Sequence, residues 1–410
     1  MARLTSEELQ AVMKKEGVDR IWSWSKINCF HTSPYEYYLK YIKKAKEDRA
    51  DSIYTTTGGI AHDILEKLYT NEITYGQMAG LFEDGWTVAA EIADLKFDRS
   101  DEDRNAKIKD KYYENLIHFF SNHTKLEKKP IIEQFVKIKI DGNLFQGYID
   151  CAFKDDDGYI TIQDFKTSSI YKGAKTENEC GQLVLYAIGL NQQGIPKDKI
   201  KICWNFLKYV SIQYEQKNGT VKTREVERCN IGESLQSNAK TWLKHFGYEP
   251  DEYLKEMLDT NSIACLPDEV KEKYTISDCY VYVDLTDKLI DKWTTHVSTI
   301  IKDIELREKD YEETHSDACF YDTDESVKAQ SYYFANLCSY SRNLHKPYDD
   351  YCKRLEAAQN GTDMFAGIGL GDDTVYTSSD NVINSKNDEL DLSWLENITW
   401  GDKYEHKLRQ

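Results

Sequence analysis

Two acids and a lysine in the middle of the chain have the types and spacing of a metal-dependent hydrolytic site. In the segment YITIQDFKTS at 159–168, Asp164 and Lys166 are two residues apart, so on a β-strand their side chains share a face. Asp150 lies on the preceding segment, FQGYIDCAF, just before the turn sequence DDDG at 155–158. If that turn pairs the two strands, Asp150 and Asp164 converge with Lys166 beside them.

This combination of side chains is suited to metal-assisted hydrolysis of a phosphodiester. Carboxylates suit Mg²⁺ or Mn²⁺, which keeps its other positions for waters or substrate phosphates. A lysine beside the metal can orient or deprotonate the attacking water and stabilise the charge that develops on phosphorus. A single Asp-x-Lys is more commonly a surface ion pair of little energetic value. The assignment therefore depends on the elements around it.

The periodicity of the flanking segments indicates an α/β core. Thr57-Gly58-Gly59 opens a helix that places His62 near its first turn, and Asp141-Gly142 supplies a hairpin turn between two strands. The order helix, three strands, helix, strand predicts a central mixed sheet flanked by helices. The predicted elements are a tyrosine-rich helical region over 1–50 interrupted at Ser33-Pro34, helices over 57–69 and 102–124, strands over 131–140, 144–153 and 159–168, a helix over 177–194, a strand over 199–210 and a helix over 285–308.

Taken in order, these motifs resemble the RecB-like branch of the PD-(D/E)XK nuclease superfamily, which includes the RecB and AddB nuclease domains, the CRISPR adaptation nucleases and many phage exonucleases. The resemblance covers about residues 22–210 and implies a restriction-endonuclease-like core with helical N-terminal and C-terminal additions. The matching blocks are WSWSKINCFHTSPYEYYLKYI for the leading segment, TGGIAHDILEKLY for the Gly-x-x-x-His helix, FQGYIDCAF for the G-x-x-D strand, ITIQDFKTS for the (D/E)-x-K strand and GQLVLYAIGL for the Q-x-x-x-Y helix.

The resemblance implies a role for each matching position, with Mg²⁺ or Mn²⁺ as the cofactor. Gln182 and Tyr186, four residues apart on one helical face, would lie over the active site and contact substrate. The implied catalytic residues are Asp150, Asp164, Lys166, Gln182 and Tyr186; the implied metal ligands are His62, Asp150, Asp164 and the backbone carbonyl of Phe165; Glu133 has a supporting role.

The cysteines depart from the pattern of those relatives that hold a [4Fe–4S] cluster with four thiolates. Ser33 stands where such relatives have the N-terminal cysteine, and the C-terminal segment has Cys338 and Cys352 but Ser341 between them. Two thiolates would be missing, so we expect no iron–sulfur cluster. A zinc site made by Cys338, His345 and Cys352 fits no usual finger spacing.

Charge and composition limit the possible cellular compartments and the ways in which the protein could bind DNA. The 410 residues carry a formal net charge of −18, of which 361–410 contributes −6 from 10 acids and 4 basic residues. Because affinity for DNA depends on basic residues local to the phosphates, the net charge does not exclude DNA as the substrate. No apolar run has the about 20 residues needed to cross a bilayer. The ten cysteines form no CxxC pair, so we expect a cytoplasmic protein of a bacterial or phage-infected bacterial cell. The candidate phosphate contacts are Lys40, Lys43, Lys44, Lys172 and Lys175.

We therefore expect a metal-dependent deoxyribonuclease, an exonuclease that acts on DNA ends in recombination, repair or phage DNA metabolism. The sequence has no GxxxxGK[ST] motif, so a helicase motor would be a separate chain; a recombinase or a single-strand-binding protein are other expected partners, and the oligomeric state is left open. The alternatives are a non-catalytic scaffold with the nuclease fold and an acidic inhibitor that imitates DNA. The expected organisation is a helical part with the His motif over 1–125, the nuclease core over 126–215, a mixed C-terminal part that closes the core over 216–360 and an acidic flexible tail over 361–410.

Overall fold

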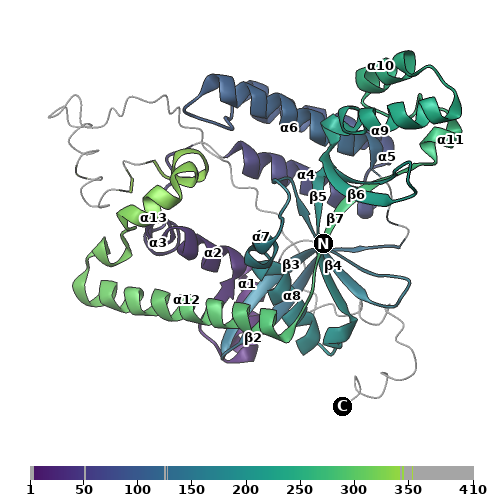
Figure 1. The fold of residues 1–410 in the computed structure, drawn as a ribbon. Helices are drawn as coiled ribbons and strands as arrows, with labels where there is room; N and C mark the ends of the chain where they lie inside the picture. The colour runs from purple at the N-terminus through teal and green to yellow at the C-terminus, as the bar shows by residue number, and fades with distance from the viewer. Residues whose placement is uncertain are drawn as a thin grey trace.

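The fold is a mixed β-sheet covered by helices on both faces (Figure 1). It is seen in a computed structural model that describes residues 4–49, 52–123, 126, 128–341, 344–345 and 353. The expected acidic tail over 361–410 lies outside the described residues, as does Cys352. In the part of the chain that is described, no helix is both long and apolar enough to cross a membrane.

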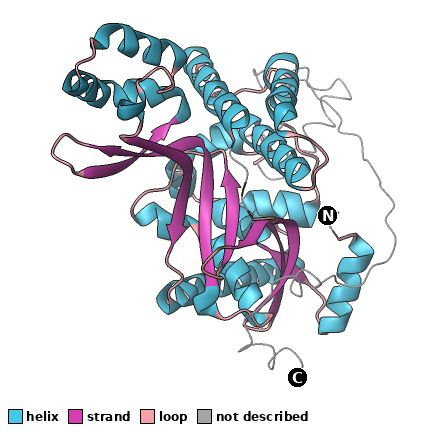
Figure 2. Cartoon of the chain, turned by 90° about the vertical axis from the view of Figure 1, so that its right-hand side faces the viewer, coloured by secondary structure: helices cyan, strands magenta, loops and turns pink. Residues whose placement is uncertain are grey.

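Seven strands of the described chain form one sheet, drawn in magenta in Figure 2. Their order is β1-β3-β4-β5-β6, with β2 also paired to β3 and β7 also paired to β5. The pairs β1–β3 and β4–β5 are parallel and the others are antiparallel, which confirms the predicted mixed sheet. The strands are β1 (Ile21–Ser23), β2 (Ile131–Ile140), β3 (Asn143–Lys154), β4 (Ile160–Lys166), β5 (Ile200–Glu215), β6 (Val221–Glu227) and β7 (Tyr274–Val283).

The β2–β3 hairpin confirms the turn predicted at Asp141-Gly142. Both turn residues have positive φ, 48° and 80°, as a two-residue type I′ loop requires, and Ile140 pairs with Asn143 across it. The next turn closes at Gly158, whose φ of 81° is readily adopted only without a side chain. These two turns fix the register of β2, β3 and β4.

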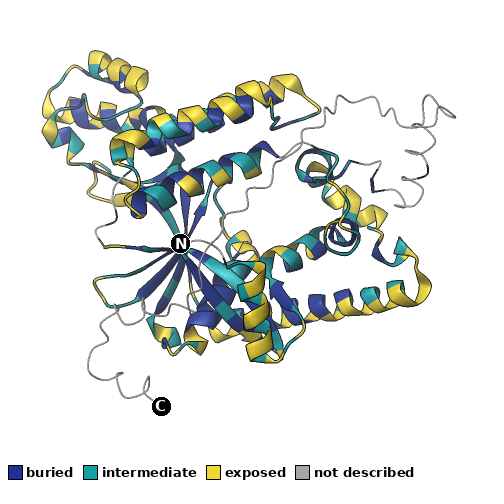
Figure 3. Ribbon diagram, turned by 180° about the vertical axis from the view of Figure 1, so that it is seen from behind, coloured by how far each residue is buried: buried dark blue, intermediate teal, exposed yellow. Residues whose placement is uncertain are grey.

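One face of the sheet is covered by the helices that carry the His motif. Their apolar side chains form a core with Phe165 of β4 and Leu207 of β5, and their polar sides face solvent (Figure 3). His62 lies on α4, between this core and the sheet. The helices are α4 (Ile53–Tyr69), α5 (Tyr75–Trp86), η2 (Thr87–Ile92) and α6 (Glu102–Asn122).

The opposite face is covered by helices from both ends of the described chain. The predicted stripe of the long helix α12, Leu289, Trp293, Val297, Ile300 and Ile304, is buried there. The helices of this layer are α2 (Trp24–Thr32), α3 (Pro34–Tyr37), η1 (Tyr38–Lys43), α8 (Gly181–Gln192) and α12 (Asp287–Thr314), with η5 (Asp317–Phe320) against them.

The remaining helices lie at the sheet's extremities or along the return of the chain. A small separate core joins α9, α10 and α11 to the far ends of β5 and β7. The segment after α12 runs back to α4, where the hydroxyls of Tyr54 and Tyr332 are 2.7 Å apart. These elements are α1 (Ser6–Glu16), α7 (Ala174–Glu179), η3 (Lys197–Lys199), η4 (Arg228–Asn230), α9 (Ile231–Phe246), α10 (Pro250–Thr260), α11 (Asp268–Lys271), α13 (Asp324–Ala329) and η6 (Tyr333–Leu337).

Three predicted elements are wrong in their limits. The region over 1–50 includes strand β1, because Ile21 and Trp22 are buried in a parallel pair with β3. Helix α4 begins at Ile53, four residues before the predicted start, since Ile53 itself is buried. The helix over 177–194 is broken at Cys180, and Gly181 then packs so closely that a Cβ there would lie 2.2 Å from the Trp24 ring.

Candidate active site

Asp150 and Asp164 lie opposite one another on neighbouring antiparallel strands. The β3–β4 register pairs Cys151 with Gln163, so the next position sets Asp150 against Asp164. The backbone N–H of Phe165 donates to Asp150 Oδ2 at 3.3 Å. The convergence predicted from the turn at 155–158 is therefore present.

Glu133 extends this row of carboxylates onto a third strand. The β2–β3 register places Glu133 opposite Asp150, but the pairing is interrupted at this one position. The φ of Glu133 is 51°, in the left-handed region that a non-glycine residue adopts at a cost of about 1–3 kcal/mol. A strained residue in the middle of a regular strand is more often found at functional sites than elsewhere. We infer that Glu133 is a candidate metal ligand in the same way as Asp150. The sequence predicted only a supporting role for it.

His62 reaches this row from helix α4 on the adjacent face. Its Nε2–H donates to the backbone carbonyl of Phe165 at 3.0 Å, since a carbonyl can only accept. The other ring nitrogen, Nδ1, then presents a lone pair 3.5 Å from Asp150 Oδ2. A lone pair and a carboxylate that face one another at this distance suit a shared cation.

Ligand atoms of His62, Glu133 and Asp150 all lie within 4.8 Å of one another. One imidazole and two carboxylates form a donor set that fits Mn²⁺ or Mg²⁺. Asp164 borders this set, and its Oδ2 lies 2.6 Å from the Nζ of Lys166. The Phe165 carbonyl, an expected ligand, accepts the hydrogen bond from His62.

The electrostatics of the site favour an added positive charge. Burial, and after it the neighbouring Asp164 carboxylate, raises the pKa of Asp150 well above its usual range. Burial alone would lower the pKa of Lys166, but Asp164 and Asp150 outweigh it and the pKa is raised. Burial also lowers the pKa of His62. If Asp150 and Asp164 are both ionised, their charge exceeds what Lys166 neutralises, and a bound cation would offset the excess.

Gln182 and Tyr186 lie together on helix α8, as the sequence predicts. The Nε2 of Gln182 donates to the Tyr186 hydroxyl at 2.8 Å. Burial raises the pKa of Tyr186, so its hydroxyl stays protonated. The Tyr186 ring packs over Gly147, where a Cβ would lie 2.3 Å from Cε1. The glycine of the G-x-x-D motif therefore admits the tyrosine of the Q-x-x-x-Y motif.

The five candidate lysines lie in different surroundings. Lys175 lines a cavity beside Tyr171, with its Nζ 4.8 Å from the ring centre. Lys172 is ion-paired to Glu225 at 2.8 Å. The others follow α3, where Lys40 is ion-paired to Glu47, Lys43 lies near the ring of Tyr311 and Lys44 ends the helical segment η1 in the left-handed region. Their contact with nucleic acid stays a prediction.

Sequence reasoning missed a set of basic residues beside the site. Arg104, Lys107 and Lys111 lie on α6, and Lys208 lies on β5; all four line the same cavity as Lys175. The spacing of the first three, i, i+3 and i+7, puts them on one helical face. That spacing could have predicted a basic face on this helix. No local sequence pattern predicts that Lys208 lies beside it.

Comparison with protein families defines the class. The model of the PD-(D/E)XK nuclease superfamily matches residues 21–322, 302 of the 410 residues. The chain belongs to this superfamily. The match spans His62, Glu133, Asp150, Asp164, Lys166, Gln182 and Tyr186. No curated protein matches the sequence.

Proposed function

We propose that the protein is a Mg²⁺- or Mn²⁺-dependent deoxyribonuclease. The observation that carries this proposal is the row Glu133, Asp150 and Asp164 on three adjacent strands, met by His62 on one side and Lys166 on the other. A scaffold that had lost catalysis would have no need for a buried excess of carboxylates, because uncompensated buried charge destabilises the fold.

In this proposal, His62, Glu133, Asp150 and Asp164 hold the metal. When bound, the metal lowers the pKa of a water and neutralises charge on the phosphate. Lys166 adds a fixed positive charge next to the scissile phosphate, and Tyr186, oriented by Gln182, donates a hydrogen bond at the substrate side. One water is consumed. Its oxygen bonds to phosphorus and the bond from phosphorus to the 3′ oxygen breaks. One proton of the water goes to that 3′ oxygen, and the other stays with the new phosphate oxygen or is released to solvent. The product then carries a 5′-phosphate.

We further propose that cleavage requires a DNA end. The support for this is the resemblance of the ordered motifs to the RecB-like branch. A separate motor, a recombinase or a single-strand-binding protein would then supply the end, in recombination, repair or phage DNA metabolism.

Digestion of linear and covalently closed DNA, labelled at either end, tests both proposals. With Mn²⁺ we expect the linear DNA to lose its label and the closed circle to resist. The variant Lys166→Ala should abolish cleavage of the linear DNA. Cleavage of the circle would overturn the end requirement. If neither DNA is cut, or if Lys166→Ala retains the activity, the deoxyribonuclease assignment is wrong and the scaffold alternative is favoured.

A further inference from the structure

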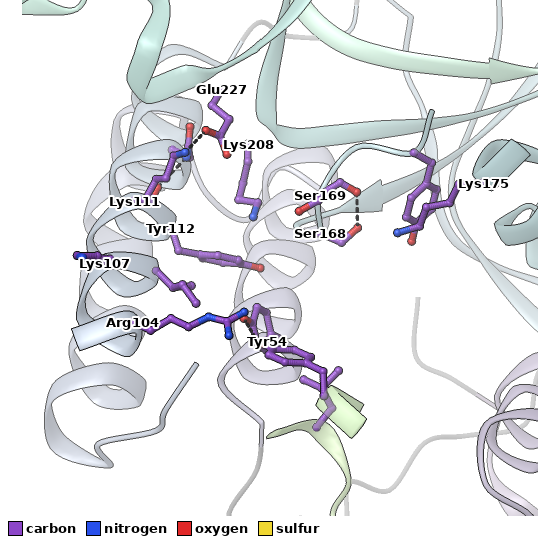
Figure 4. A pocket seen from close by; sticks show the side chains of 15 residues that line it. Tyr54, Arg104, Lys107, Lys111, Tyr112, Ser168, Ser169, Lys175, Lys208 and Glu227 are labelled. Atoms are coloured by element: carbon purple, nitrogen blue, oxygen red, sulfur yellow. Dashed lines mark hydrogen bonds and ion pairs between the residues drawn. The ribbon is translucent and has the colours of Figure 1, made fainter. Parts of the chain in front are cut away.

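A basic cavity of about 730 Å³ lies between helix α6 and the segment that follows β4 (Figure 4). Arg104, Lys107 and Lys111 line it from α6, Lys208 lies between Lys111 and Ser169, and Lys175 lies on the opposite side. Among the described lining residues Glu227 is the one carboxylate. Five cations and one carboxylate give the lining a net charge of +4, in a chain whose net charge is −18.

Lys208 is the lining residue whose surroundings point most clearly to a missing anion. It is 8% exposed, and its Nζ lies 4.1 Å from the centre of the Tyr112 ring. Within the described chain Lys208 has neither a hydrogen bond nor an ion pair. Glu227, which could neutralise it, is ion-paired to Lys111. An ammonium that is buried beside an aromatic ring but with no counter-ion is costly, so its presence indicates an anion that comes from outside.

An irregularity in strand β5 presents Lys208 to the cavity. The pairing of β5 with β7 stops at Asn205 and resumes at Val210, and Lys208 lies between. Such irregularities redirect a side chain away from its regular alternation. Burial lowers the pKa of Lys208 to about 8, against the opposing effect of Glu227.

The α6 cations form a row that suits a ligand with repeated charges. Arg104 to Lys111 spans seven residues, about 10 Å along the helix axis. Arg104 also lies 3.4 Å from Asp98, whereas Lys107 is exposed. A single phosphate could meet one or two of these groups at a time, but a chain of phosphates could meet all of them.

Two elements of the active site also contribute residues to the lining of the cavity. Ser168 and Ser169 line it, and they lie two and three residues after Lys166, which ends β4. Tyr54 also lines it, on the helix α4 that carries His62 eight residues, or about 12 Å, further on. A strand that leaves the active site past β4 therefore enters the cavity.

We propose that this cavity holds unpaired DNA that continues from the scissile phosphate, with its phosphates against α6 and Lys208 and its bases against Tyr54, Tyr171 and Tyr332. The proposal rests on the proposed nuclease function for the identity of the ligand. In a duplex the bases are already stacked and paired with one another, so they are not free to stack on protein rings. The tyrosines supply the stacking surfaces on which single strands are held without sequence preference.

Fluorescence anisotropy of the full chain in EDTA tests this proposal without cleavage. The probes are a labelled oligothymidylate about 15 nucleotides long and a blunt hairpin duplex of the same charge. We expect the single strand to bind about tenfold more tightly than the duplex, and Lys208→Gln to weaken that binding about fivefold. Lys107→Gln, at an exposed position, should reduce the slope of log affinity against log salt by about 0.7. Lys288→Gln, at an exposed position on α12 outside the cavity, should change neither.

The possible outcomes distinguish the proposal of a DNA-binding cavity from the proposal of nuclease activity. Equal binding of duplex and single strand, or unchanged binding and salt slope in both Lys208→Gln and Lys107→Gln, overturns the cavity proposal. If the wild type then still cuts DNA with Mn²⁺, the proposed function stands. A protein that binds the single strand through Lys208 but cuts no DNA with Mn²⁺ supports the cavity and overturns the proposed catalysis.

Discussion

The ring of Tyr186 occupies the space that the missing side chain of Gly147 leaves above strand β3. A Cβ at position 147 would lie 2.3 Å from Cε1 of Tyr186, closer than side chains approach one another. Tyr186 accepts a hydrogen bond from Gln182, and Asp150 follows Gly147 by three residues on the same strand. Within the G-x-x-D motif, the glycine contacts the helix that covers the site, and the aspartate three residues later is a candidate metal ligand.

Gly147→Ala should therefore impair both folding and catalysis. Overpacking of a close contact costs about 1–3 kcal/mol, and here it would displace Tyr186. Denaturant unfolding measures the first effect and the turnover number the second. Gly59→Ala is the matched control, because a Cβ there meets nothing within 4 Å and a helix interior favours alanine. If Gly147→Ala is as stable and active as Gly59→Ala, the close contact between Gly147 and Tyr186 is not required for folding or catalysis.

Asp150→Asn should separate stability from metal binding. Burial and the Asp164 carboxylate raise the pKa of Asp150, so on folding at neutral pH it must either bury a charge or take up a proton. Asparagine needs neither, so the melting temperature in EDTA should rise. The asparagine oxygen can still accept from Phe165 N–H. The same change removes a carboxylate ligand, so the increase in melting temperature that Mn²⁺ causes in the wild type should be lost.

Calorimetric titration with Mn²⁺ checks the same variant directly. We expect affinity to fall at least about tenfold. Asp63→Asn is the control, since Asp63 lies beside His62 in the sequence but is exposed and ion-paired to Lys67. An Asp150→Asn protein that binds Mn²⁺ as tightly as this control would remove Asp150 from the ligand set.

The sequence predicted those parts of the fold that local patterns determine. The turn at Asp141-Gly142 and the alternation around Asp164 are local, and with them the convergence of Asp150 and Asp164 was predictable. The role of Glu133 was not, because its positive φ arises from the pairing of β2 with β3. Lys208 reads as an ordinary strand residue, and only the register shift between β5 and β7 presents it to the cavity.

Long-range packing explains the elements that the sequence analysis got wrong. Strand β1 has three residues and exists because β3 offers it a parallel edge. The break at Cys180 is fixed by the rings of Trp24 and Trp293, which come from distant segments. The predicted four-part division of the chain stays a prediction. The core beside α8 draws residues from both α2 and α12.

The purified protein should contain no iron. Ser33 and Cys338, which the resemblance aligns with cluster positions, make other polar contacts. Ser33 Oγ donates to Asp322 Oδ2 at 2.8 Å, and Cys338 Sγ lies 3.2 Å from His345 Nε2. Burial raises the pKa of the Cys338 thiol, which opposes its use as a thiolate ligand. Iron analysis and the visible absorption spectrum after anaerobic reconstitution check this. A stable brown protein would contradict it.

Lys208→Met should stabilise the protein at neutral pH. The gain in the free energy of unfolding would measure how far the buried Lys208 charge destabilises the fold. The pKa of Lys208 falls from 10.5 to about 8 on folding, a difference of about 2.5 units or about 3 kcal/mol. Below pH 8 the lysine is charged in both the folded and unfolded states, so the full penalty applies. Between about pH 8 and 10.5 the unfolded state binds more protons, so stability rises with pH and the penalty disappears.

The advantage of Lys208→Met in the free energy of unfolding should therefore be largest below pH 8 and decline toward pH 10.5. Urea unfolding of both proteins at a series of pH values measures it. The exposed control Lys288→Met should stay within about 0.5 kcal/mol of the wild type throughout. A gain of the same size at every pH would mean that methionine merely packs better. No gain at all would mean that Lys208 is already neutralised in the free protein, which would remove its need for a phosphate.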